Sequence, residues 1–118
     1  MESATHVRIV LVTCGSLAEA RRIARGVVSR RLAACVNVIT APVESVYRWK
    51  GKVERAREFL LVCKTTRSRL AALEKEIHRL HSYDVPECIA LPVTEGSRRY
   101  LLWLTEQVRP GPRRGSSK

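Results

Sequence analysis

The stretch Ser45–Glu54, SVYRWKGKVE, decides the fold of this chain because it reads as the tip of a β-hairpin. Successive side chains of an extended strand point to opposite faces. Tyr47 and Trp49 therefore share one face, and Arg48 and Lys50 share the other. This separation is typical of a strand with one packed side and one solvated side, and it favours a packing role for the aromatic pair.

The glycine within this stretch marks the turn. A Lys-Gly pair between two strand-like runs is typical of a tight hairpin turn, in which Gly51 adopts a positive φ. The chain then returns through an apolar run, EFLLVCKT, at residues 58–65. We therefore predict a long hairpin from about residue 43 to residue 65.

Upstream of the hairpin, the sequence predicts a strand, a helix and a second strand. The run HVRIVLVT, residues 6–13, is nearly all apolar, like a strand in the middle of a sheet. Ser16, followed three residues later by Glu19, is a capping-box signature for the start of a helix. Apolar residues then recur at helical spacing as far as about Arg31. The second strand is AACVNVITAP, residues 33–42.

Downstream, two helices flank a short strand. Residues 68–80 carry apolar side chains three and four positions apart, as in an amphipathic helix. Residues 87–91 lie between two prolines and read as a short strand. Ser97 caps a final helix. The predicted apolar anchors of that helix are Leu101, Trp103 and Leu104.

This order of elements predicts an α+β fold. Two halves joined by a hairpin form the ferredoxin-like (split β-α-β) sandwich, in which two helices cover one face of an antiparallel sheet. The long β-hairpin and an extra C-terminal helix are additions to that plan. We expect one domain over residues 1–108. Residues 109–118 contain two prolines and four Lys or Arg, so we expect a disordered basic tail there.

The predicted sheet is too apolar for one chain to cover. The runs IVLV, CVNVI and FLLVC are apolar on both sides, but two helices cover only one face. We therefore expect further copies of the chain to cover the second face. The aromatic side of the hairpin, with Tyr47 and Trp49, is the predicted interface.

Composition limits the classes of partner. The 118-residue chain is 45% hydrophobic and 28% charged, as expected of a soluble single domain. Its net charge of +11 would allow nucleic-acid binding. However, the aromatics and cations of the hairpin lie on opposite faces, so we do not expect nucleic acid as a partner. No apolar run approaches the roughly 20 residues of a membrane span, so we expect no membrane partner and a cytoplasmic location.

The four cysteines, at positions 14, 35, 63 and 88, show no C-x-x-C pair. Disulfide frameworks and zinc sites usually have closer pairs. Each cysteine lies in or beside an apolar run. The spacing therefore favours buried thiols in a reducing compartment.

Four motifs, in their order and spacing, closely resemble the CutA family of divalent-cation tolerance proteins. They are RRLAACVNVI, VYRWKGKVE, FLLVCKT and LHSYDVPECIALPVTEGSRRYLLWL. The resemblance covers roughly residues 7–106. It implies a ferredoxin-like subunit that forms a homotrimer, similar to that of the nitrogen-signalling regulators, with hairpins joining neighbouring sheets. It also implies a role in tolerance of divalent metal ions.

The resemblance implies one metal-binding residue. In this family, copper has been associated with a histidine pair before the VPE element and with a cysteine late in the first strand. Here the histidine positions hold Leu80 and His81, and the cysteine position holds Val12, with Cys14 two residues further on. The resemblance therefore carries over His81 alone.

The residues themselves allow a metal site and a simpler alternative. His78 and His81 are three positions apart and could face the same way on a helix. Imidazoles with nearby carboxylates, here Asp84 and Glu87, can bind Cu(II) or another divalent cation. In the alternative, His78 faces solvent, and His81 interacts with the C-terminal end of the helix dipole.

A ligand cleft is a second candidate site. Lys64, Tyr83, Glu87 and Trp49 are polar or amphipathic residues inside the motifs. In a trimer they could line a cleft between subunits for a small anion or metabolite. The alternative is a structural ion pair between Lys64 and Glu87, with Trp49 packed in the interface.

No catalytic residue is predicted. The sequence has no G-x-S-x-G motif and no glycine-rich phosphate loop. Cys35 and His81 could form a nucleophilic pair only if the fold brought them together. We therefore predict a trimeric, non-enzymatic protein of divalent metal ion (copper) tolerance. The alternatives are a PII-like sensor trimer that binds a small anionic ligand at intersubunit clefts, and a basic nucleic-acid-binding module.

Overall fold

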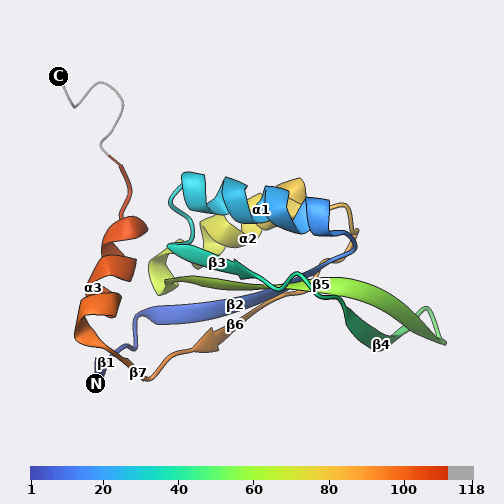
Figure 1. The fold of residues 1–118 in the computed structure, drawn as a ribbon, viewed down its shortest axis with the longest axis horizontal. Helices are drawn as coiled ribbons and strands as arrows, with labels where there is room; N and C mark the ends of the chain where they lie inside the picture. The colour runs from blue at the N-terminus through green and yellow to red at the C-terminus, as the bar shows by residue number, and fades with distance from the viewer. Residues whose placement is uncertain (112–118) are drawn as a thin grey trace.

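The computed structural model describes residues 1–111, and Figure 1 shows its fold. Its main sheet has the strand order β3-β5-β2-β6, with β4 beside β5, and every pairing is antiparallel. The strands are β2 (Val7–Cys14), β3 (Cys35–Val38), β4 (Val43–Trp49), β5 (Lys52–Thr66) and β6 (Cys88–Pro92). This is the order of the ferredoxin-like sandwich, so the predicted fold class is confirmed.

Two helices cover one face of this sheet (Figure 1). They are α1 (Leu17–Ser29) and α2 (Leu70–Leu80), and α2 follows a 3₁₀ turn at Arg67–Arg69. Every second strand residue points toward the helices, and these side chains form the main core with the apolar stripes of α1 and α2. The core includes Val10, Val12, Cys14, Ile23, Val27, Leu61, Cys63, Leu73 and Ile77.

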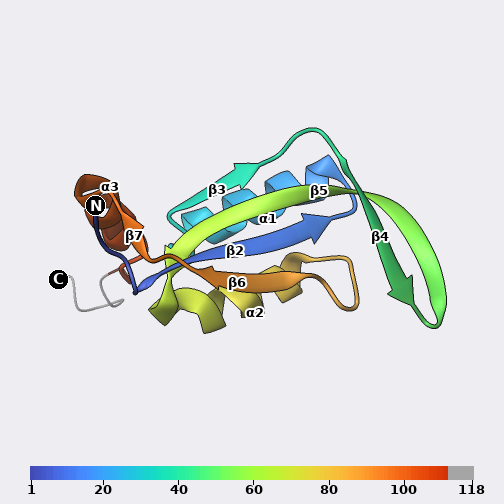
Figure 2. The ribbon, with the colours of Figure 1, turned by 90° about the horizontal axis from the view of Figure 1, so that it is seen from below.

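The predicted long hairpin is confirmed. Strand β5 has 15 residues because its inner part pairs with β2 and β3, whereas its outer part pairs with β4. Lys50 and Gly51 form the turn, with φ values of 51° and 81°. Positive φ at both positions is typical of the type I′ hairpin turn. The hairpin extends beyond the rest of the sheet, as Figure 2 shows from below.

The C-terminal helix packs beside the N-terminal segment, away from the hairpin (Figure 1). Helix α3 (Arg98–Gln107) follows β7 (Glu95–Gly96), which pairs with β1 (Glu2–Ser3). The Oγ of Ser97 accepts a hydrogen bond from the backbone N–H of Tyr100, as expected of the predicted cap.

Of the three predicted anchors of this helix, two are correct. Leu101 and Leu104 are buried against Ala4 and Val7. The prediction for Trp103 is wrong, because its side chain is 44% exposed. The buried stripe of a helix recurs every three or four residues, and a residue directly before Leu104 falls outside it. Residues 112–118, which form most of the predicted tail, lie outside the described residues.

The second face of the main sheet has no helix over it within residues 1–111 (Figure 2). The register places Leu11 between Val62 and Ile89, and Ile9 beside Leu91, so these side chains share that face. Ile89 is 52% exposed and Leu91 is 45% exposed. A row of apolar side chains is thus left open to water in the single chain.

All four cysteines are free thiols; Cys14 and Cys63 are buried, and Cys35 and Cys88 are half-buried. Among the described residues, each helix is too short or too polar to cross a lipid bilayer.

Candidate functional site

The site is built where β2 ends and α1 begins. Cys14 is the last residue of β2, and Ser16 caps α1 by accepting the backbone N–H of Glu19 at 3.2 Å. Only this half of the predicted capping box is present. The Glu19 carboxylate accepts the backbone N–H of Ser82 at 2.9 Å, on the segment after α2. Glu19 thereby ties the start of α1 to residue 82.

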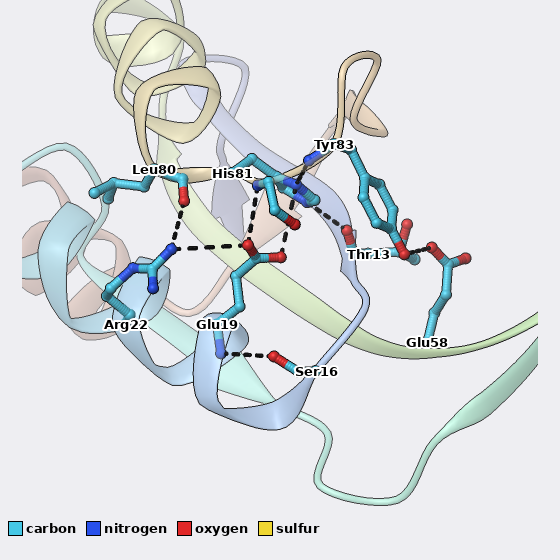
Figure 3. Close-up of polar contacts among 9 residues, drawn as sticks. Thr13, Ser16, Glu19, Arg22, Glu58, Leu80, His81 and Tyr83 are labelled. Atoms are coloured by element: carbon cyan, nitrogen blue, oxygen red, sulfur yellow. Dashed lines mark hydrogen bonds and ion pairs between the residues drawn. The ribbon is translucent and has the colours of Figure 1, made fainter.

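His81 follows α2, and its imidazole is fully buried. Its Nε2 lies 2.7 Å from the carbonyl oxygen of Thr13, and its Nδ1 lies 3.1 Å from the backbone nitrogen of Tyr83 (Figure 3). A carbonyl can only accept and an N–H can only donate, so the ring is assigned as neutral with its proton on Nε2. Its Nδ1 therefore carries a lone pair. The other candidate histidine, His78, is exposed on α2.

Cys14, Glu19 and His81 converge in the protein interior. One ligand atom from each lies within 4.8 Å of the other two, and all three residues are buried. Nδ1 of His81 is 3.7 Å from Oε1 of Glu19. With bonds of 2.0–2.3 Å, ligand atoms around one tetrahedral zinc ion are about 3.3–3.8 Å apart. The distances between the three ligand atoms are thus close to those around a bound metal ion, without any movement of the side chains.

Electrostatics keep this thiol protonated in the absence of a metal. Burial, followed by the nearby charges of Glu19 and Glu58, raises the pKa of Cys14 from 9.0 to about 12. The Arg22 side chain lies at the edge of the cluster: it donates to the carbonyl of Leu80 at 2.8 Å and lies 3.7 Å from Glu19. A metal ion would have to displace the thiol proton to gain the sulfur ligand.

A cavity of about 580 Å³ lies between the hairpin and the segment after His81. Its lining is Thr13, Ser45, Val46, Tyr47, Trp49, Glu58, Tyr83, Asp84, Val85 and Glu87. The phenol of Tyr83 reaches across it and donates to Oε2 of Glu58 at 2.9 Å (Figure 3). This volume is within the range of small-molecule sites.

The Glu58 carboxylate influences two neighbouring groups, the phenol of Tyr83 and the carboxyl group of Glu87. Burial, followed by the hydrogen bond to Glu58, raises the pKa of Tyr83 above its ordinary value. Burial and the charge of Glu58 also raise the pKa of Glu87. Gly15 makes room for the phenol, because a Cβ at this position would lie 3.1 Å from the Tyr83 oxygen.

Comparison with known proteins identifies the family. Residues 8–107 match the family model of the CutA1 divalent ion tolerance protein. The chain belongs to the CutA1 family. It is 47% identical over 100 residues to the divalent-cation tolerance protein CutA of Thermus thermophilus, with 85% of this chain and 96% of that protein covered. The crystal structure of CutA1 from Oryza sativa superposes with a TM-score of 0.86 at 41% identity, covering 93% of this chain and 100% of that one.

Some CutA relatives are considerably longer than the matched region. The chloroplastic CutA protein of Arabidopsis thaliana is 45% identical over 101 residues, but these cover only 55% of its length against 86% of this chain. The shared part is therefore the domain described above.

The fold of this CutA1 chain brings together three of the four residues predicted for the ligand cleft. Trp49, Tyr83 and Glu87 all line the cavity. Lys64 is not among the lining residues; it sits in β5 opposite Ile9 and Cys35 in the sheet ladder. Tyr47 also lines the cavity and is 44% exposed in the single chain. Its predicted role in a subunit interface stays a prediction.

Sequence reasoning missed two partners of His81. Cys14 was interpreted as a buried thiol only, and Glu19 as half of a capping box. The signal was present in the topology: a strand end followed closely by a helix start places Cys14 near Glu19. Antiparallel α1 and α2 then place the residue after α2 beside the first turn of α1. The thiol beside His81 is consequently Cys14, whereas Cys35 lies on the uncovered face of the sheet, opposite Lys64.

Proposed function

We propose that this CutA1 chain is a non-enzymatic protein of divalent metal ion tolerance that binds copper, or a similar cation, through Cys14, Glu19 and His81. The observation that supports the proposal is the convergence of these three donors within 4.8 Å. Thiolate and imidazole together suit copper and zinc better than magnesium or calcium. The carboxylate adds a negative charge that favours a divalent ion.

The arrangement predicts modest affinity. Nδ1 of His81 accepts the N–H of Tyr83, and Glu19 accepts the N–H of Ser82. A metal ion that takes these acceptors leaves two backbone N–H groups to find other partners. It also displaces the proton of Cys14. Each loss offsets part of the energy of metal binding.

The same features argue against covalent catalysis. A nucleophilic cysteine needs a thiolate at neutral pH, which a lowered pKa or an adjacent base provides. Burial instead raises the pKa of Cys14 to about 12. The neighbouring imidazole is hydrogen-bonded to Tyr83 and Thr13 rather than to the thiol.

We also propose that the working form is a cytoplasmic homotrimer. Ile89 and Leu91 lie on an uncovered apolar face, and Trp49 is 45% exposed on the hairpin. The row of apolar side chains on the sheet is the kind of exposed surface that marks a site of association. Neighbouring copies would cover the face that the chain's own helices leave open. The four free thiols are consistent with a reducing compartment.

Metal titration tests the proposal. The purified protein is titrated calorimetrically with Zn(II), which is redox-inert, and with Cu(II), in the absence of oxygen. We expect saturable binding of one ion per chain, lost or strongly weakened in Cys14→Ser and His81→Gln. The matched controls are Cys88→Ser, a half-buried thiol outside the cluster, and His78→Gln, an exposed imidazole. Equal binding by both pairs of variants would refute the site.

A further inference from the structure

A basic hollow lies on the two helices that cover the sheet. Its lining is Arg30, Leu32, Ala72, Lys75, Glu76, His78 and Arg79. Helices α1 and α2 lie on the opposite side of the sheet from the uncovered apolar face, and the hairpin extends away from them (Figures 1 and 2). Copies that associate through the uncovered face and the hairpin would therefore leave this hollow open to solvent.

A buried carboxylate holds the two arginines of the hollow. Nε and Nη2 of Arg79 donate to the two carboxylate oxygens of Glu76 at 3.0 and 2.7 Å, and Nε of Arg30 lies 3.5 Å from the same carboxylate. The hydrogen bonds from Arg79, together with the charge of Arg30, hold the pKa of the Glu76 carboxyl below its usual range. The Glu76 side chain is 8% exposed, whereas those of Arg30 and Arg79 are 62% and 58% exposed. A ligand that approaches from solvent therefore meets the guanidinium groups before the carboxylate.

Two more basic side chains extend the positive charge along α2. Lys75, His78 and Arg79 are three and four positions apart, so they share one side of the helix, and all three are exposed. Within residues 1–111, Lys75 forms no ion pair. Arg30, Lys75 and Arg79 thus bring three positive charges to the hollow against the one negative charge of Glu76. Protonation of His78 would add a fourth positive charge.

The charge is concentrated in the helical layer rather than spread evenly over the chain. Residues 17–31 and 67–81 contain nine Lys or Arg and three Glu, a net charge of nine minus three, or +6 of the chain's +11. Glu19 and Glu76 are buried, so Glu74 is the only exposed acid of these two ranges. Like charges one helical turn apart destabilise a helix, whereas opposite charges stabilise it. A surface that keeps this excess despite the repulsion favours a role in binding an anion.

We propose that this hollow binds a di- or triphosphate group. Phosphate oxygens accept bidentate hydrogen bonds from the planar guanidinium fork, and Nη1 of Arg79 is not used by Glu76. Because Glu76 already orders both arginines, phosphate binding loses less side-chain entropy. Lys75 and Arg79 are separated by about 6 Å along the helix, at 1.5 Å per residue, so the cations span more than one phosphate group.

The hollow suits the phosphate groups and not an attached base. Within the described residues, no Phe, Tyr or Trp lines it, so a nucleoside would find no ring on which to stack. Free triphosphate and a nucleoside triphosphate should therefore bind alike. This site is separate from the metal cluster, because none of Cys14, Glu19 and His81 lines the hollow.

Imidazole signals in NMR spectra locate the binding. The sequence has three histidines, and the variant His78→Gln identifies the signal of the one in the hollow. In buffer that contains EDTA, inorganic tripolyphosphate should shift the His78 signal saturably and leave that of His6, an exposed histidine beside Thr105, in place. Adenosine triphosphate should bind with similar affinity, and orthophosphate about tenfold more weakly or less tightly still. The absence of a saturable His78 shift, or a large gain in affinity from the base, would overturn the proposal.

A matched pair of variants separates a site from net charge. Lys75→Gln should weaken tripolyphosphate binding about fivefold or more. Arg25→Gln removes the same charge from an exposed residue of α1 outside the lining and should leave the affinity nearly unchanged. Equal affinities in the two variants would overturn the proposal, because the net charge of the protein would then explain the binding. A changed mass of Lys75→Gln in light scattering would also overturn it, because the hollow would then face a second copy.

Discussion

The thiol of Cys14 makes metal binding dependent on pH in a way that can be calculated. Burial raises the pKa of this thiol to about 12, so at pH 7 the thiolate costs about 7 kcal/mol, at 1.36 kcal/mol per pKa unit. Zn(II) must therefore displace one proton from Cys14 when it binds. We expect the apparent affinity to rise about tenfold per pH unit, or about a hundredfold between pH 7 and pH 9. Competition with a chromophoric chelator of known proton affinity measures this slope.

Calorimetry in two buffers with different ionisation enthalpies gives the number of protons released, and we expect one per ion. Cys14→Ser should remove both the release and the slope, because a serine hydroxyl stays protonated. Cys88→Ser is the matched control, since Cys88 is a free thiol outside the cluster. Retained affinity without proton release would contradict the reasoning, because the sulfur would then not be a ligand.

Three further outcomes follow from the structure. Ile89→Asp places a charge on the uncovered apolar face and should reduce the mass in light scattering from roughly 40 kDa, three times 13.3 kDa, to that of one chain. The control Val28→Asp changes an exposed residue of α1 and should leave the mass unchanged. A single-chain mass for the unmodified protein would refute the trimer. Thr65→Val removes the buried hydroxyl that donates to the carbonyl of Leu32 at 2.7 Å. Urea titration should show a free energy of unfolding lower by about 1–3 kcal/mol. An unchanged value would mean that the hydrogen bond contributes no net stability. Burial raises the pKa of Cys63 from 9.0 to about 12, so the stability contributed by the protonated thiol is complete below pH 9 and is lost as the pH rises toward 12. Between pH 9 and pH 11 the free energy of unfolding of the unmodified protein should fall by up to about 1.4 kcal/mol per pH unit more than that of Cys63→Ala. Parallel losses in the two proteins would show that burial does not protect the thiol from ionisation.

The sequence was sufficient for the main elements because their patterns are local. Alternation around Gly51 predicted the hairpin, and helical spacing predicted α1 and α2. The two-residue strands β1 and β7 are too short to show any period, so they could not be predicted. The error at Trp103 arose because an aromatic residue was counted as an anchor by its type. Its position relative to Leu101 and Leu104 excludes it from their stripe.

The site was harder to predict because its members come from distant parts of the chain. Trp49, Tyr83 and Glu87 were grouped by chemistry and motif, and the fold does bring them together. Lys64 was grouped with them for the same reason, but the register of β5 places it opposite Cys35 and Ile9. The positive charge that an anion-binding cleft would need is thus absent from the cavity lining within one described chain, and the predicted intersubunit cleft stays a prediction. Sequence spacing alone could not reveal which β5 residues face the cavity, because that depends on where the pairing of β5 with β4 ends.

One strand end serves both sites, because adjacent side chains of a strand point to opposite faces. Cys14 points to the helices and the metal cluster, and Thr13 points to the cavity. The segment after α2 connects the two sites in turn. Tyr83 donates its backbone N–H to His81 on one side and its phenol to Glu58 on the other. A metal ion bound to Nδ1 of His81 would take the acceptor of the Tyr83 backbone N–H. The same Tyr83 donates the phenol hydrogen bond that Glu58 accepts. The metal cluster and the cavity are therefore linked through Tyr83, because its backbone contacts His81 and its phenol lines the cavity.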